Sequence, residues 1–141
     1  MPSLLFKRLN DGWNAEPNAP DPKVSIRLSQ VQLSFLLNCF AYEADKNETG
    51  CLTFNDCSTW RLGPTNDEGW YAGQCRYGKS APAWGEFYEL VGQDDLRMTP
   101  VDWQIPASPD SGKRHFLFYL RDETFECIAS EWNFERQSAL V

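Results

Sequence analysis

The sequence has one histidine, no C-x-x-C spacing among its five cysteines, and no long apolar run. Transition-metal sites draw their ligands from histidine and closely spaced cysteine, so we expect neither a metal nor another cofactor. Odd in number and scattered, the cysteines are expected to be reduced and mostly buried. No apolar run approaches the roughly 18 residues that span a bilayer, and the charges of Met1–Arg8 are misplaced for a secretory signal. These absences predict a soluble, cytoplasmic protein that does not bind membranes.

Positive charge is also scarce, since the chain carries a net charge of −7 from 20 acidic and 13 basic residues. A nucleic-acid-binding surface needs clustered lysine and arginine. The longest basic cluster here is only Lys113-Arg114-His115, so nucleic acid is not an expected partner. An acidic surface favours encounter with a cationic partner, although acidity also serves solubility alone.

Length and composition predict one globular domain over residues 1–141. Nine prolines leave little room for long helices. Short segments with apolar residues at every second position are typical of strands. We therefore predict a mainly β fold, an antiparallel sandwich or strongly bent sheet of roughly seven to nine strands. The expected strands cover residues 4–9, 24–28, 31–37, 52–54, 60–62, 84–91, 116–120 and 125–129.

Polar residues between these segments predict the turns. Ser29-Gln30 is expected to join the second and third strands, and Asn55-Asp56 to place Trp60 on the partner of the strand at Leu52. The stretch from Phe116 to Leu120 is apolar on both faces, which predicts a central strand. Residues 121–124 are expected to turn it into the next strand.

Two segments also fit a helical pattern. Leu33, Leu36, Leu37, Phe40 and Ala44 can share one helix face within residues 29–46. The same holds within residues 124–137 for Phe125, Ile128, Ala129 and Trp132. The strand interpretation is preferred in both cases because alternation is present and the linkers are short. The alternative is an α+β fold with one or two short helices.

Motifs for catalysis are weak. His115 has no recognisable nucleophile or orienting acid near it in sequence, which favours a structural role. Residues 73–80 match G-x-x-x-x-G-K-[ST], but the preceding residues are polar and Pro82 follows, whereas a true P-loop joins a buried strand to a helix. Paired acids occur at Glu86 and Glu89 and at Asp67-Glu68, although such pairs arise by chance among 20 acids. We therefore do not expect an enzyme.

The clustering of aromatic residues is the pattern in this sequence that most strongly suggests a binding function. Between Trp60 and Glu89, seven of the twenty aromatic residues occur within thirty positions, separated by glycines. Tryptophan, tyrosine and arginine dominate the binding energy of protein interfaces, while such rings equally often belong to a core. The candidate partner-binding residues are Asp67, Glu68, Trp70, Tyr71, Arg76, Tyr77 and Trp84.

In size, acidity and lack of catalytic motifs, the chain resembles the immunity proteins of bacterial toxin systems. That resemblance implies a small cytoplasmic protein that binds and blocks a cognate toxin, often a basic nuclease. The alternative is a carbohydrate or small-ligand-binding β domain that uses Trp70, Tyr71 and Trp84 as stacking platforms. An enzyme with an unrecognised carboxylate site is a third reading.

Overall fold

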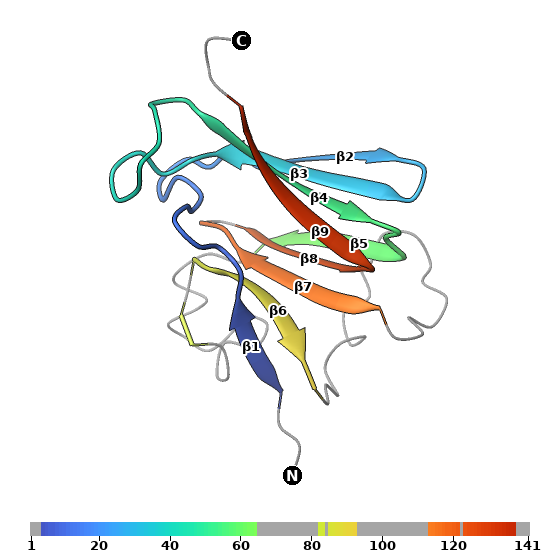
Figure 1. The fold of residues 1–141 in the computed structure, drawn as a ribbon. Helices are drawn as coiled ribbons and strands as arrows, with labels where there is room; N and C mark the ends of the chain where they lie inside the picture. The colour runs from blue at the N-terminus through green and yellow to red at the C-terminus, as the bar shows by residue number, and fades with distance from the viewer. Residues whose placement is uncertain (1–3, 65–81, 84, 93–112, 122, 138–141) are drawn as a thin grey trace.

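The protein is an antiparallel β sandwich, as the sequence predicts (Figure 1). The computed structural model describes residues 4–64, 82–83, 85–92, 113–121 and 123–137, none of which is helical. The five-stranded sheet has the order β1 (Leu5–Arg8), β6 (Phe87–Val91), β7 (Arg114–Tyr119), β8 (Glu123–Ala129) and β5 (Thr59–Pro64). The four-stranded sheet has the order β2 (Lys23–Arg27), β3 (Gln30–Leu36), β4 (Thr49–Asn55) and β9 (Glu131–Gln137).

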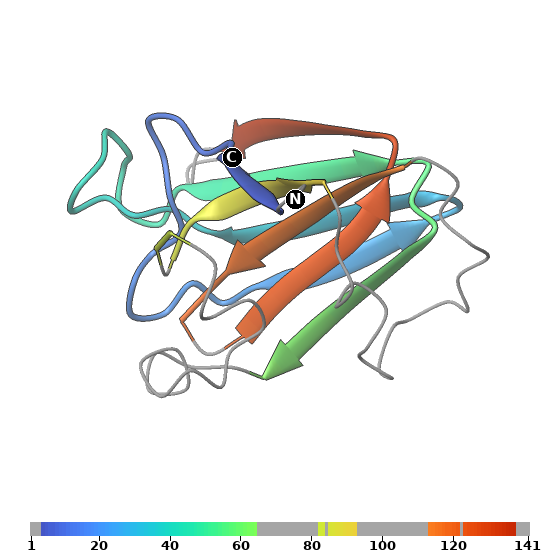
Figure 2. The same cartoon turned by 90° about the horizontal axis from the view of Figure 1, so that it is seen from below.

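The two sheets lie face to face and bury a core between them (Figure 2). In β3, Val31, Leu33 and Phe35 are buried and alternate with half-buried polar residues, which is the period of two expected for a strand. This alternation confirms the strand and excludes the helical alternative for β3. The turn before it lies at Leu28-Ser29, one residue earlier than predicted, because Arg27 pairs with Gln30.

The predicted pairing of the segment around Trp60 with β4 is wrong. β5 pairs with β8 in the other sheet, so that Trp60 lies opposite Cys127. The connection passes through Asp56, whose φ of 53° turns the chain out of β4. Trp60 and Leu62 therefore pack against the core from the opposite layer.

The central strand is predicted correctly, since β7 is the third of five strands. Phe116 and Phe118 face the core between the sheets, and Leu117 belongs to a second buried cluster. Adjacent β6 behaves in the same way, with Phe87 on one face and Tyr88 on the other.

The C-terminal segment is extended. β8 and β9 are strands of different sheets joined at Ser130, so the helical alternative is wrong here too. Trp13, from the connection between β1 and β2, fills the core and stacks on Phe134 with ring centroids 3.9 Å apart. No described segment forms a helix long and apolar enough to cross a membrane.

Candidate functional site

The predicted partner-binding residues lie outside the part of the chain that the structure describes. They are Asp67, Glu68, Trp70, Tyr71, Arg76, Tyr77 and Trp84. Their convergence into one surface therefore stays a prediction. Of the other rings in the same stretch, Trp60 packs against the core and Phe87 and Tyr88 are buried.

Glu86 and Glu89 are held by different partners. Glu89 accepts two hydrogen bonds of 2.8 Å from the Arg114 guanidinium, which lowers the pKa of its carboxyl group. Glu86 instead accepts a bond of 2.6 Å from Asn10 and lies 3.9 Å from Arg8. Two-carboxylate hydrolysis needs both groups to face one substrate, and this arrangement does not favour it.

His115 belongs to a buried polar cluster around the Arg61–Glu126 ion pair. Its Nε2 lies 2.8 Å from Glu126 Oε1, and Arg61 donates to Glu126 Oε2 at 2.8 Å. Both His115 and Glu126 have side chains that are 0% exposed. The sequence neighbour Arg114 is directed elsewhere, to Glu89, because successive strand residues point to opposite faces. The geometry is that of an internal ion-pair cluster rather than a site open to substrate.

A site open to solvent lies at one end of the sandwich, where several connections gather. We call this region the loop end and define it as residues 9–20, 37–48, 82–83, 85–86 and 120–121. In Figure 1 the blue and teal connections of the loop end project together beyond the strands, and Figure 2 shows them side by side from below. Binding residues commonly sit on such loops because the sheets hold them in place.

The loop end contains a cavity of about 390 Å³. Its volume lies within the range of small-molecule sites. The described lining is polar, with side chains or backbone from Asn14, Glu16, Asn18, Asn38, Gly85 and Arg121, and with Ala15, Pro17, Tyr119 and Leu120 completing the wall.

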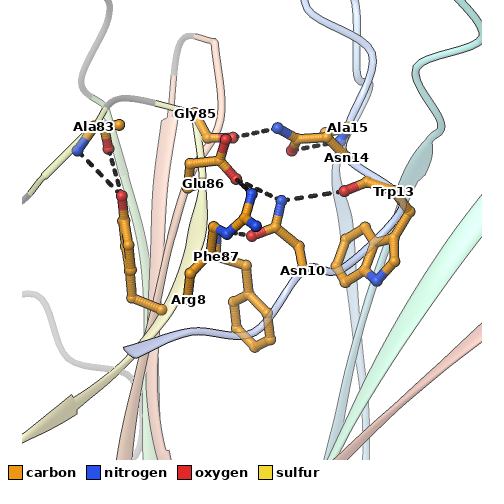
Figure 3. Close-up of polar contacts among 10 residues, drawn as sticks. Arg8, Asn10, Trp13, Asn14, Ala15, Ala83, Gly85, Glu86 and Phe87 are labelled. Carbon is orange, nitrogen blue, oxygen red and sulfur yellow. Dashed lines mark hydrogen bonds and ion pairs between the residues drawn. The ribbon is translucent and has the colours of Figure 1, made fainter. Parts of the chain in front are cut away.

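Asn10 lies in the protein interior behind the wall of this cavity and holds the wall in place. Its side chain is buried, donates to the Trp13 carbonyl at 3.1 Å and to Glu86 Oε2 at 2.6 Å, and accepts from the Phe87 amide at 3.1 Å. Figure 3 shows Asn10 bridging these two chain segments. One amide side chain thus hydrogen-bonds both the connection between β1 and β2 and the start of β6, which fixes the distance between them.

Asn14 makes a second link across the same gap. Its Nδ2 donates to the Gly85 carbonyl at 2.7 Å, and its Oδ1 accepts from the Ala15 amide at 2.8 Å (Figure 3). The Asn14 carbonyl in turn accepts from the Asn38 amide at 2.9 Å. Three connections are therefore tied into one rigid wall.

The rim of the cavity continues into an exposed acidic loop. Asn38 Oδ1 accepts from the amides of Phe40 and Ala41 at 2.9 and 3.1 Å, which forms a tight turn. Phe40 lies in this turn and is 76% exposed. Single exposed apolar residues are common, but an exposed ring on a fixed turn is a ready contact for a partner.

The acidic loop is held to β9 by Arg136. This guanidinium donates to both carboxylate oxygens of Glu48, at 2.8 and 2.9 Å, and to the Glu43 carbonyl at 2.6 Å. Hydrogen bonding from Arg136 lowers the pKa of Glu48 from 4.5 to about 2. Glu43, Asp45 and Lys46 in the same loop are exposed, and Glu48 is paired with Arg136, so the loop presents two carboxylates and one ammonium group from a fixed backbone.

These groups define what the loop end can do. The side chains of Asn18, Asn38 and Arg121 can bind polar groups, while Phe40 and the exposed acids can contact a basic surface. The Glu16 carboxylate accepts from the amides of Asn18 and Ala19 and shapes the wall. Among the described residues, no cluster of three histidine, cysteine or acidic side chains could hold a metal ion. The described lining also contains neither histidine nor cysteine.

Comparison of the chain with protein-family models, with curated proteins and with solved structures found no match.

Sequence reasoning did not identify the loop end. By sequence, Asn10, Asn14 and Asn38 are ordinary turn residues, because the side-chain partners of Asn10 and Asn14 lie up to 77 positions away. The usable signal was Phe40, a large ring three residues before the charged segment Glu43–Glu48. In the sequence pattern, Phe40 is interpreted only as part of the alternative helix face within residues 29–46.

Proposed function

We propose that this chain is a binding protein whose loop end docks a basic protein partner, in the manner of the immunity proteins that block bacterial toxins. The observation that carries the proposal is the placement of Phe40, which is 76% exposed on the turn that Asn38 stabilises. Aromatic rings are the commonest anchors of protein interfaces. Burial of this ring by a partner is the expected source of affinity.

Charge and rigidity support the same function. Glu43 and Asp45 are exposed in the same loop as Phe40, together with Lys46, and the net charge of the chain is −7. Such a field speeds encounter with a basic partner. The bonds from Arg136 to Glu48 hold the loop before binding, so less conformational entropy is lost on docking.

The test uses the protein encoded beside the gene of this chain as the candidate partner, with affinity measured by calorimetry. Phe40→Ala is expected to weaken binding by roughly 30-fold, which corresponds to about 2 kcal/mol. The matched control is Leu5→Ala, which removes a residue that is 63% exposed on β1 and should leave affinity unchanged. Equal affinity of Phe40→Ala and the unmodified protein would reject the loop end as the docking surface.

The electrostatic part has its own measurement. The double variant Glu43→Gln, Asp45→Asn should slow association and weaken its dependence on salt, with little change in dissociation. An association rate that is indifferent to salt in the unmodified protein contradicts a charge-steered encounter.

A second function, binding of a carbohydrate or another small polar ligand, is favoured by the cavity itself. Three asparagines line it, and side-chain amides are suited to hydroxyl groups. Asn14 and the Glu16 carboxylate are bonded within the wall, so Asn18 and Asn38 are the amides that this function would use. Titration with a glycan panel, followed by the amide signals of Asn38 and Arg121, tests this function. Saturable shifts that disappear in Asn38→Ala would support it, and no shift across the panel would reject it.

A further inference from the structure

The two outer strands of the four-stranded sheet carry opposite charges. β2 and β9 are the edges of this sheet among the described strands. On the face that points away from the core, β2 presents Lys23 and Arg27, whereas β9 presents Glu131 and Glu135, and all four residues are exposed. The charges are therefore segregated by edge.

The charges are also in register. Arg27 pairs with Gln30, whose amide bonds Asn55 at 3.0 Å, and Asn55 pairs with Glu131. Lys23, Ser34, Cys51 and Glu135 form a second continuous row across the sheet. Each row thus begins with a cation at β2 and ends with a carboxylate at β9. The Lys23 cation also lies 3.6 Å from the exposed Asp21 carboxylate that precedes β2, so Arg27 is the cation on this edge that faces a partner without that neighbour.

The core-side rows match in the same way. Ile26 shares a row with Trp132, and Val24 shares a row with Phe134. Ile26 is 48% exposed at its edge. A strand with the pattern of β9 placed beside β2 would cover Ile26 with an indole ring and set carboxylates opposite Arg27 and Lys23.

The backbone permits this placement. Neighbouring strands of the sheet are all antiparallel, so β2 and β9 run in opposite directions. Residues along an antiparallel ladder alternate in whether their N–H and C=O groups point to one neighbour or the other. In a four-stranded sheet, the two residues at the ends of one row either both point their N–H and C=O groups outward or both point them inward. β9 of a second copy can therefore pair with β2 along the same rows without a shift in register.

We propose that the β2 edge binds the β9 edge of a second copy of this chain, which extends the four-stranded sheet head to tail. Charged edge residues usually prevent sheets from joining. Such protection works between copies when the charges on the two meeting edges have the same sign. Here the meeting edges have opposite signs in both rows, and the charges attract. The contact is heterologous, so it repeats until the twist of the sheet closes a ring or a short filament forms.

A five-residue edge strand is a small interface, so the association is weak. The test measures the mass of the full chain by sedimentation equilibrium from micromolar to millimolar concentration. The mass is expected to rise with concentration toward multiples of 16.2 kDa. A constant monomer mass over the whole range overturns the proposal.

Two charge reversals test the register. Lys23→Glu with Arg27→Glu, and separately Glu131→Lys with Glu135→Lys, should each raise the dissociation constant by roughly tenfold or more. An equimolar mixture of the two variants should associate again, because each reversed edge then faces an opposite charge. Reversed variants that associate like the unmodified protein, or a mixture that stays monomeric, also overturn the proposal.

The matched control is Lys7→Glu with Lys46→Glu, which makes the same change in net charge as the β2 reversal at exposed positions on other segments. This control should associate like the unmodified protein, and loss of association there would mean that net charge, not the edge, is responsible. Thermal unfolding of every variant separates loss of association from loss of fold. This inference is independent of the proposed docking at the loop end, since it concerns other residues and another partner.

Discussion

Arg136 on β9 binds both carboxylate oxygens of Glu48, a residue 88 positions earlier in the chain. The pair joins the acidic loop to the edge of the four-stranded sheet. Since the loop is exposed, the value of this contact lies in fixing the shape of the loop rather than in stabilising the whole domain.

The pKa of Glu48 predicts how the loop responds to acid. Hydrogen bonds from Arg136 lower this pKa from 4.5 to about 2. A lowered carboxyl pKa contributes stability that is present above the unfolded value and is lost as pH falls through the folded value. The loop should therefore stay ordered at pH 4.5 and loosen as pH approaches 2, as seen in the NMR signals of residues 40–48. In Arg136→Gln the Glu48 midpoint should move up, and an unmodified midpoint near 4.5 would contradict the pair.

Leu28 occupies a turn position that favours glycine. It has a φ of 56° and is 93% exposed. Its left-handed backbone conformation therefore costs free energy that no burial of the side chain offsets. Leu28→Gly should raise the free energy of unfolding by about 0.5–1 kcal/mol, measured by urea denaturation. Ser29→Gly is the control, because Ser29 is not in the left-handed region and its replacement should not stabilise the protein. A loss of stability in Leu28→Gly would contradict the strain.

Gly50 is required by close packing. A Cβ at this position would lie 2.8 Å from Phe134, 2.9 Å from Leu37 and 3.0 Å from Phe35. Gly50→Ala should therefore lower the free energy of unfolding by about 1–3 kcal/mol. Adding Phe134→Leu should recover part of that loss in a double-mutant cycle, whereas strictly additive effects would show that the clash with Phe134 is not the cause.

Glu126 is the centre of the buried polar cluster and the partner of Arg61 in its ion pair. Glu126→Gln removes the charge that faces both Arg61 and His115, and loss of one partner from a buried ion pair costs about 3–5 kcal/mol. Chemical denaturation measures the loss. Asp21→Asn, which changes an exposed pair with Lys23, is the control and should have little effect. Comparable losses for the two variants would argue against a buried role for Glu126.

Much of the strand pattern could be predicted from local sequence, but the candidate site could not. Alternation at Val31, Leu33 and Phe35 is a property of neighbouring residues, and so is the two-sided apolar character of β7. The loop end depends on Asn10 and Asn14, whose side chains bond Glu86, Phe87 and Gly85 from a distant segment. The predicted aromatic surface around Trp70 lies outside the described residues and stays a prediction.

Composition and local period by themselves determined an acidic chain of short antiparallel strands, because charge and a repeat of two can be read one residue at a time. Only the tertiary structure decided which sheet each strand joins, as β5 shows by pairing with β8 instead of β4. It also decided that Asn10 meets Glu86, Arg136 meets Glu48 and His115 meets Glu126. The apolar pattern of a strand predicts which face each side chain occupies. The partner of that side chain depends on how the two sheets stack, and the stacking is set by contacts from the whole chain.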